Sequence, residues 1–233
     1  MTRLNIKPYF PLRLIILTAL ICCFLFGKSV GYSAQNAFDD LMVRNFTYAD
    51  NVKIRKMQQA VLDFKKKVLE LFEKAVNSGR LQLWQIMDRF YIPVPLSHFK
   101  KVLKEKFTEA YRNFPVLFTT EYTEFFEQEI LPIQKQFVKE YGCFYIAAVD
   151  VNGYCASHNA NKPLTGNMKA DIAGSRSRRM YSDIMGLRAS RNTTKEILLL
   201  DYIRDTGERF ADMSSPIIFR GKHWGAVRLG FRF

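Results

Sequence analysis

The chain of 233 residues has a formal charge of +13, with 35 lysines and arginines against 22 acids, and 48% of its residues are hydrophobic. This composition is typical of a globular protein and excludes a disordered, collagen-like or low-complexity chain. Four cysteines are too few for a disulfide scaffold of this length. The charge excess indicates either a nucleic-acid footprint or a more local accumulation of cations.

The positive charge is distributed unevenly along the chain. Residues 1–34 carry four basic side chains and no acid, and residues 35–142 carry 17 basic against 14 acidic side chains. Residues 143–233 carry 14 basic and 8 acidic side chains. Almost a third of the excess therefore lies in the first 34 residues, outside the expected folded body, and the largest share lies in the C-terminal region.

Residues 1–34 have the pattern of an export signal. Three basic residues, Arg3, Lys7 and Arg13, precede an unbroken apolar run over residues 14–27. This length suits a signal-peptide core of about 7–15 residues and is short of the roughly 20 needed to span a bilayer. The alternative is an uncleaved N-terminal membrane anchor. In both cases the basic N-terminus stays inside, so we expect residues 35–233 in the periplasm, secreted after cleavage or anchored in the inner membrane.

Residues 35–80 are expected to form one long amphipathic helix. No Pro or Gly occurs between residues 35 and 78, and Ser78-Gly79 is a helix-stop signal. Apolar residues recur at alternating steps of three and four, at Ile54, Met57, Val61, Phe64, Val68, Leu71 and Ala75. This seam is compatible with two arrangements, a homodimer through residues 54–75 or a helix packed against its own domain.

Residues 81–142 are predicted to be a helical segment with interruptions that leads into the next domain. Pro93 and Pro95 impose extended backbone before them, and Ser97 can cap a helix over residues 98–112. Pro132 is expected to kink a second helix that runs to residue 141. Four acids follow a polar face of that helix, which is typical of a solvated surface: Glu121, Glu124, Glu127 and Glu129.

From residue 143 onward the hydrophobic period changes from that of a helix to that of a strand. Five strands are predicted, over residues 143–149, 154–158, 197–203, 210–219 and 223–233. Asn152-Gly153 is the signature of a type I′ turn between the first two. The fold class is therefore α+β, with a long N-terminal helix and a helical region followed by a five-stranded antiparallel sheet. The connection over residues 159–195 is expected to cover one sheet face and enclose a pocket, as in PAS-like sensor domains.

The two cysteines of this region are expected to be buried apolar residues. With Asn152 and Gly153 in the turn, Asp150 faces Cys155, and Cys143 lies an odd number of residues from Asp150. Cys143 and Cys155 then point to opposite faces of the sheet, so we expect no disulfide between them. Neither belongs to a Cys-x-x-Cys-His haem-attachment pattern.

An ordered series of motifs resembles the ligand-sensing PAS/Cache-like domain of bacterial methyl-accepting chemotaxis proteins. The matching segments are residues 88–95, 130–134, 147–154, 157–159, 163–166, 171–176, 186–193, 202–208 and 221–230. The long cytoplasmic signalling hairpin of those receptors does not occur in the 233 residues. The resemblance implies a sensor domain over residues 143–233 that binds a small molecule between the sheet and the connection 159–195.

The same connection is unusually cationic. It carries Arg176, Arg178, Arg179, Arg188 and Arg191 against Asp171 and Asp183. Guanidinium groups bind carboxylate or phosphate bidentately, which favours an anionic ligand. The alternative is that Arg176 and Arg188 are structural and pair with acids of the domain. The residues expected nearest the pocket are His158, Asn159, Arg176, Arg188, Asn192, Tyr202 and Trp224.

Motifs of catalysis and metal binding are missing from the sequence. The three histidines are scattered without zinc-ligand spacing, and neither a nucleophile elbow nor a phosphate-binding glycine loop occurs. We therefore expect no enzymatic activity, no metal and no cofactor. An exported domain without a recognition motif is also not expected to bind nucleic acid.

The sequence thus predicts an extracytoplasmic small-molecule sensor domain that takes part in signal transduction through a membrane signalling partner. The alternative is a non-signalling envelope protein that binds a ligand or has a structural role.

Overall fold

The computed structural model describes residues 47–203 and 209–233, with the backbone alone for residues 202 and 203. The predicted signal or anchor over residues 1–34 and the first part of the predicted helix, residues 35–46, lie outside the described residues. Within the described ranges, no helix combines the length and the apolar character needed to cross a membrane.

The first described helix, α3 (Tyr48–Asn77), packs against its own domain. It begins at a capping box in which Thr47 Oγ1 accepts the Asp50 N–H and Asp50 accepts the Thr47 N–H. Five of the seven predicted seam residues are buried, and Phe72 is buried where the seam predicts Leu71. A homodimer through residues 54–75 would need the same side chains that are buried here against the sheet and α7. Of the two predicted arrangements, the helix packed against its own domain is therefore the one observed.

The helical region after α3 is more broken than predicted. The predicted helix over 98–112 is α5 (Leu96–Leu103), which begins after Pro95, followed by the 3-10 turns η1 (Lys104–Lys106) and η2 (Glu109–Asn113). The α-helix ends where Lys104 adopts a φ of +51°. A short helix, α4 (Leu83–Ile86), precedes this segment.

Pro132 interrupts the second predicted helix in an unexpected way. The helix runs as α6 (Thr123–Phe125), a π-helical turn η3 (Phe126–Ile130) and α7 (Leu131–Tyr141). Pro132 lacks an N–H and its ring crowds the carbonyl one turn earlier, so a widened turn before it removes the conflict. The predicted interruption is therefore a π-turn.

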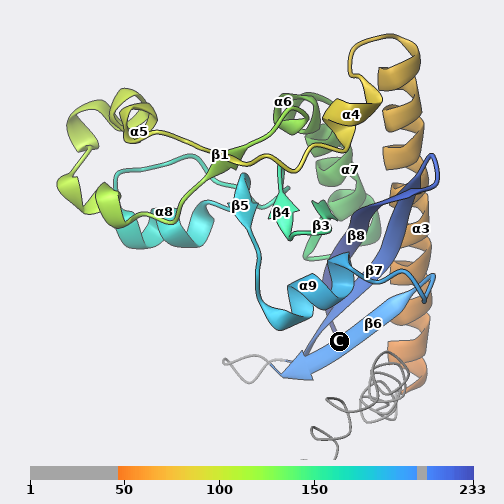
Figure 1. The fold of residues 1–233 in the computed structure, drawn as a ribbon. Coiled ribbons are helices and arrows are strands. Elements are labelled where there is room, and N and C mark those ends of the chain that lie inside the picture. The colour runs from red at the N-terminus through yellow and green to blue at the C-terminus, as the bar shows by residue number, and fades with distance from the viewer. Residues whose placement is uncertain (1–46, 204–208) are drawn as a thin grey trace, which may run out of the picture. The chain divides into compact units, whose positions relative to one another are not determined.

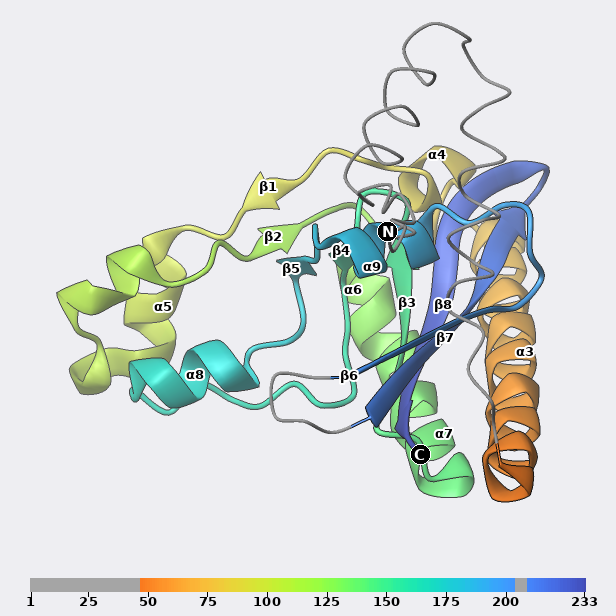
Figure 2. The same cartoon turned by 90° about the horizontal axis from the view of Figure 1, so that it is seen from below.

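The main sheet has four antiparallel strands and not the predicted five. Their spatial order is β3 (Tyr145–Asp150), β8 (Lys222–Arg232), β7 (Arg209–Phe219) and β6 (Leu198–Ile203). Helices α3 and α7 cover one face, and α9 (Ile184–Ser190) lies over the other, as Figures 1 and 2 show. The strand boundaries lie within two residues of the predicted ones, so the fold is α+β as expected.

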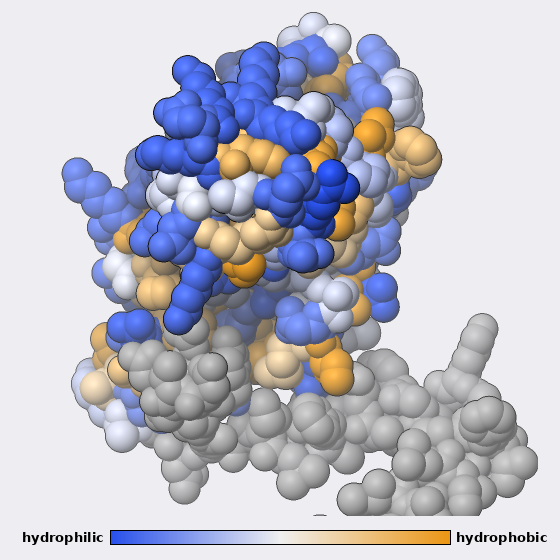
Figure 3. All heavy atoms as spheres, turned by 90° about the vertical axis from the view of Figure 1, so that its left-hand side faces the viewer, coloured by the Kyte–Doolittle hydropathy of each residue, from blue (hydrophilic) through white to orange (hydrophobic). Residues whose placement is uncertain are grey.

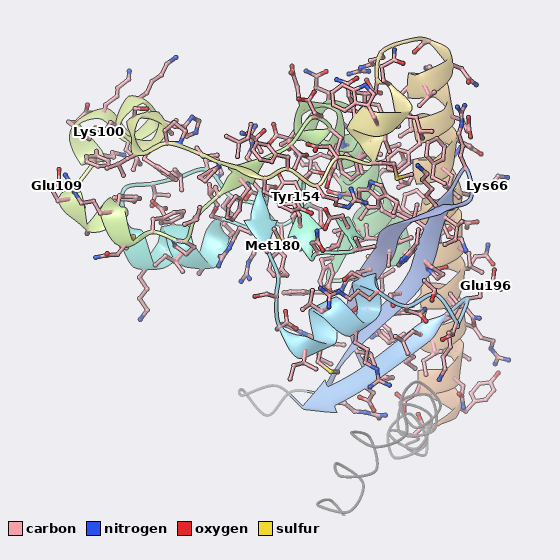
Figure 4. All side chains as sticks on the ribbon, viewed as in Figure 1. Lys66, Lys100, Glu109, Tyr154, Met180 and Glu196 are labelled. Atoms are coloured by element: carbon pink, nitrogen blue, oxygen red, sulfur yellow. The ribbon has the colours of Figure 1, made fainter. Side chains whose placement is uncertain are left out.

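The chain leaves the main sheet at the turn after β3, so the predicted second strand does not join this sheet. β4 (Tyr154–Cys155) pairs instead with β5 (Arg179–Met180), and Tyr154 and Met180 lie together at the centre of Figure 4. The Asp150 carboxylate accepts the Tyr154 N–H at 2.9 Å, and Asn159 Oδ1 accepts the Ile146 N–H of β3 at 3.0 Å. These side chains take donors that a further strand would use.

The turn itself also differs from the predicted type I′ hairpin. The Gly153 N–H bonds to the Asp150 carbonyl, so Val151 and Asn152 are the central residues, one position earlier than predicted. Of this turn, Gly153 alone has a positive φ, +87°. The Asp150 carboxylate also accepts the Asn152 N–H, and this side-chain cap selects the observed turn.

A small lobe extends from the sheet domain on a two-stranded ribbon, visible on the left of Figure 1. The ribbon pairs β1 (Ile92–Pro93) with β2 (Phe118–Thr119), and the lobe contains α5, η1, η2 and α8 (Met168–Gly174). It has its own apolar core around Phe99 and Tyr111, and the Tyr111 hydroxyl donates to Asp171. Its outer face is mostly hydrophilic (Figure 3), with Lys100 and Glu109 at its tip (Figure 4).

The main core lies between α3, α7 and one face of the sheet. Trp224 is its largest side chain; it stacks on Phe126 at 5.4 Å and donates Nε1–H to the Ile86 carbonyl at 2.8 Å. Cys143 belongs to this core, whereas Cys155 packs with Ala147 and Val149 on the other sheet face. The prediction that the two cysteines are buried on opposite faces is confirmed.

Candidate functional site

A pocket of about 300 Å³ lies between the sheet and the connection 159–195. Alternate residues of β3, Tyr145, Ala147 and Val149, form part of its floor, because successive strand residues point to opposite faces. Strands β7 and β8 complete the floor with Phe210, Asp212 and Arg228. Cys155 and His158 line it beside the floor, and the connection supplies Ala160, Arg176, Tyr181, Asp183 and Met185.

A buried ion pair is built into the pocket floor. Arg228 Nη2 lies 2.5 Å from Asp212 Oδ2, and the two residues are 9% and 2% exposed. The Tyr145 hydroxyl donates to the same carboxylate. Burial alone would lower the pKa of Arg228, but the Asp212 carboxylate outweighs it and raises that pKa. Arg228 therefore stays charged, and its charge is neutralised within the floor.

His158 presents a buried hydrogen-bond donor to the pocket. The residue is 8% exposed, and burial together with the charges of Arg176 and Arg228 lowers its pKa to about 4. The ring is therefore neutral at pH 7. Its Nδ1 accepts the Ala160 N–H at 3.1 Å, which assigns the ring proton to Nε2. None of the described residues accepts this Nε2–H, so it is available to a bound molecule.

Arg176 provides the second donor group at the pocket. Asn161 Oδ1 accepts its backbone N–H at 2.7 Å, and its carbonyl accepts the Tyr181 hydroxyl at 2.9 Å. These bonds fix the backbone and leave the guanidinium exposed at the pocket wall. Across the described ranges, no carboxylate forms an ion pair with it.

Most of the other arginines of the connection have structural roles. Arg178 forms a bidentate pair with Glu127 at 2.6 and 2.7 Å. Arg179 donates to the carbonyls of Ile172 and Ser175, and Arg191 donates to the Val151 carbonyl. Arg188 lies on α9 and does not line the pocket. Of the five arginines of the connection, Arg176 is the one that lines the pocket.

Of the seven predicted site residues, the pocket brings together His158 and Arg176. Asn159 caps the edge of β3, and Asn192 closes its own loop by donating to the Lys195 carbonyl at 2.6 Å. Trp224 belongs to the core on the opposite sheet face. The Tyr202 backbone pairs with Phe210, and its side chain lies outside the described part of the chain.

The pocket residues that the sequence analysis missed share one signal. Asp212 stands between Ala211 and Met213, and Arg228 stands between Val227 and Leu229. A charged residue within an otherwise apolar strand is buried only when it has a partner. Two such positions of opposite charge in neighbouring predicted strands point to an ion pair on one face.

Comparisons with known proteins give a partial structural likeness. No family model and no curated protein matches the chain. The sensory domain of the Campylobacter jejuni chemoreceptor Tlp3 is 12% identical, with a TM-score of 0.33 over 78% of this chain and 63% of that one. The sensor domain of the V. cholerae histidine kinase DctB is 8% identical, with a TM-score of 0.33 over 79% of this chain and 58% of that one.

Both solved structures are sensory domains, the class of domain that the sequence motifs resemble. The chain spans less than two thirds of the length of either. TM-scores of this size do not establish a function, so the function has to be inferred from the residues of this chain.

Proposed function

We propose that this chain is an extracytoplasmic sensor domain that binds a small organic molecule in the pocket between the sheet and the connection 159–195. The observation that carries the proposal is the pair of donors that lines this pocket: the His158 Nε2–H, which has no acceptor among the described residues, and the Arg176 guanidinium. A ligand acceptor can take the His158 hydrogen bond, and a negative group can pair with the guanidinium.

The pocket chemistry favours a ligand with a carboxylate-like group on an apolar body. Arg176 and His158 supply donors, and Arg176 forms no ion pair with a described acid. The second acid of the pocket, Asp183, caps α9 and interacts electrostatically with Arg228. Ala147, Val149 and Met185 supply apolar contacts. Asp212 is already engaged by Arg228, so this carboxylate adds little net charge.

The signalling step is proposed as a shift of populations. A ligand that bridges Arg228 or Tyr145 in the sheet and Arg176 in the connection favours the conformations in which both walls are held together. Because α9 packs on β7 and β8, and the same strands pack on α3, such a change can reach the N-terminal helix and a membrane partner.

Thermal-shift measurements on the full chain test the ligand class. We expect an organic acid that binds to raise the Tm by roughly 5–10 °C at a hundredfold excess over Kd. Arg176→Gln should weaken its binding by about tenfold or more, because a charge-assisted bond is lost. The matched control is Arg112→Gln, which removes an exposed arginine of the small lobe. Stabilisation by neutral compounds and by no anion would refute the anionic class.

Hydrogen exchange with and without a bound acid tests the sensor role. A sensor should show protection of the connection together with a change along α3. Protection restricted to the pocket would instead favour a non-signalling envelope ligand-binding or structural protein. The mass of the exported protein tests the topology, because retention of residues 1–34 identifies an anchor.

A further inference from the structure

A second cavity, the acidic groove, lies between the α4–β1 segment and the helix α6–η3. It has a volume of about 760 Å³ and shares no lining residue with the pocket described above. Its walls combine large apolar side chains from residues 84–92 with carboxylates from residues 88–127. The polar helix face that the sequence predicts to be merely solvated forms one of these walls.

The apolar wall of the groove is unusually exposed. Trp84, Phe90 and Ile92 are 63%, 73% and 50% exposed. All three line the same groove, so their apolar surfaces are concentrated in one place. Concentrated exposed apolar surface of this kind marks interaction sites in soluble proteins.

Three further lining residues of the groove are the carboxylates Asp88, Glu121 and Glu124. Glu121 and Glu124 accept hydrogen bonds from the neutral amides of Gln85 and Gln128. Asp88 accepts the backbone N–H groups of Phe90 and Glu121. The groove thus holds three acids that form no ion pair with any described residue, in a chain whose net charge is +13.

One further acid of the groove is already neutralised. Glu127 is held by Arg178 in a bidentate pair. Arg178 also attracts Glu124 electrostatically without forming an ion pair with it, and Asp88, Glu121 and Glu124 remain open to an occupant.

The acids are spread along the groove and do not converge. Glu121 lies in the turn before α6, Glu124 lies on α6 and Glu127 on η3, whereas Asp88 comes from the segment between α4 and β1. Within the described residues, no group of three acidic, His or Cys side chains could hold a metal ion. This arrangement therefore suits several separate positive charges better than one compact ion.

We infer that the acidic groove binds an aliphatic polyamine. The amines of such a molecule, separated by three or four methylenes, can each approach a different carboxylate of the groove. Its methylene segments can pack on Phe90 and Ile92, and an ammonium group over the Trp84 ring gains a cation–π interaction.

Calorimetric titration of the full chain with spermidine tests this inference. We expect saturable binding that weakens with added salt. The double variant Glu121→Gln/Glu124→Gln should weaken binding roughly tenfold. Trp84→Ala should weaken it about threefold. Glu105→Gln, which removes an exposed acid of the small lobe, is the matched control and should bind like the parent chain. Circular dichroism of each variant verifies the fold.

Three outcomes would overturn the inference. The first is equal spermidine binding by the parent chain and the double variant. The second is binding of butylamine or Mg²⁺ as tight as that of spermidine, which would indicate a non-selective acidic surface. The third is much tighter binding of a trilysine peptide, which would indicate a basic protein segment. Arg176→Gln should leave spermidine binding unchanged, so this inference and the proposed sensor function can fail separately.

Discussion

Removal of the Asp212 carboxylate is expected to destabilise the protein severely. The variant Asp212→Asn keeps the shape of the side chain and leaves Arg228 charged in a site where it is 9% exposed. Breaking a buried ion pair by removing one partner costs about 3–5 kcal/mol. The Tyr145 hydroxyl loses its charged acceptor as well, so the upper part of this range applies.

Urea denaturation followed by circular dichroism measures this cost. We expect a lower midpoint with an unchanged m-value, since the area exposed on unfolding stays the same. The Tm should fall by about 10 °C for a domain of this size. The matched control is Glu196→Gln, which removes an exposed acid 3.9 Å from Lys65 and should cost at most a few tenths of a kcal/mol.

A double replacement separates the loss of a partner from the loss of packing. Arg228→Met with Asp212→Leu removes both charges and keeps most of the buried volume. Because the isolated charge is the costly feature, the double variant should recover most of the stability that Asp212→Asn loses. The reasoning is refuted if Asp212→Asn costs less than about 1 kcal/mol, or if the double variant is no more stable than the single one.

Three further predictions concern stability. The unfolded His158 protonates below about pH 6.5 and the folded ring only near pH 4, so stability is complete above pH 6.5 and falls by about 3 kcal/mol toward pH 4. His158→Gln should remove this part of the pH dependence in urea midpoints measured at pH 7, 5.5 and 4. Trp224→Ala should cost about 3–5 kcal/mol in thermal denaturation, because it empties the centre of the core. Gly225→Ala should cost about 1–3 kcal/mol by the same assay, because its Cβ would lie 2.2 Å from the Val149 carbonyl oxygen.

The sequence predicts the strands of the main sheet well because their apolar periods are long and their turns carry Gly. It does not predict where β4 pairs, because that choice depends on side chains that cap backbone groups. Asp150 and Asn159 take N–H donors near the free edge of β3, and neither role follows from strand propensity. Helix interruptions are likewise visible as prolines, but their form, a π-turn or a 3-10 turn, depends on local packing.

Trp224 lies on the sheet face opposite to the one that strict alternation along its strand predicts. Strict alternation along residues 223–233 places Trp224 on the face of Arg228. The register between β7 and β8 shifts between Ile217 and Ile218, where Gly225 and then His223 are the partners. Such a bulge reverses the phase of the alternation, so Trp224 enters the core while Arg228 lines the pocket. Gly225, which directly follows Trp224, is the one signal of this shift in the sequence, because a glycine inside a strand often marks a bulge.

The arginines of the connection show why charge density along a sequence does not give the charge of a site. Arg178, Arg179 and Arg191 are directed to Glu127 and to backbone carbonyls, and Arg228 is neutralised by Asp212. In the same chain, three carboxylates that line the acidic groove form no ion pair with any described residue. A protein with a net charge of +13 can therefore present one pocket with a single unpaired arginine and one groove with several acids outside ion pairs, among the described residues. The charge of each ligand follows from the groups that the fold leaves unpaired, which is why Arg176 decides the first site and Glu121 and Glu124 decide the second.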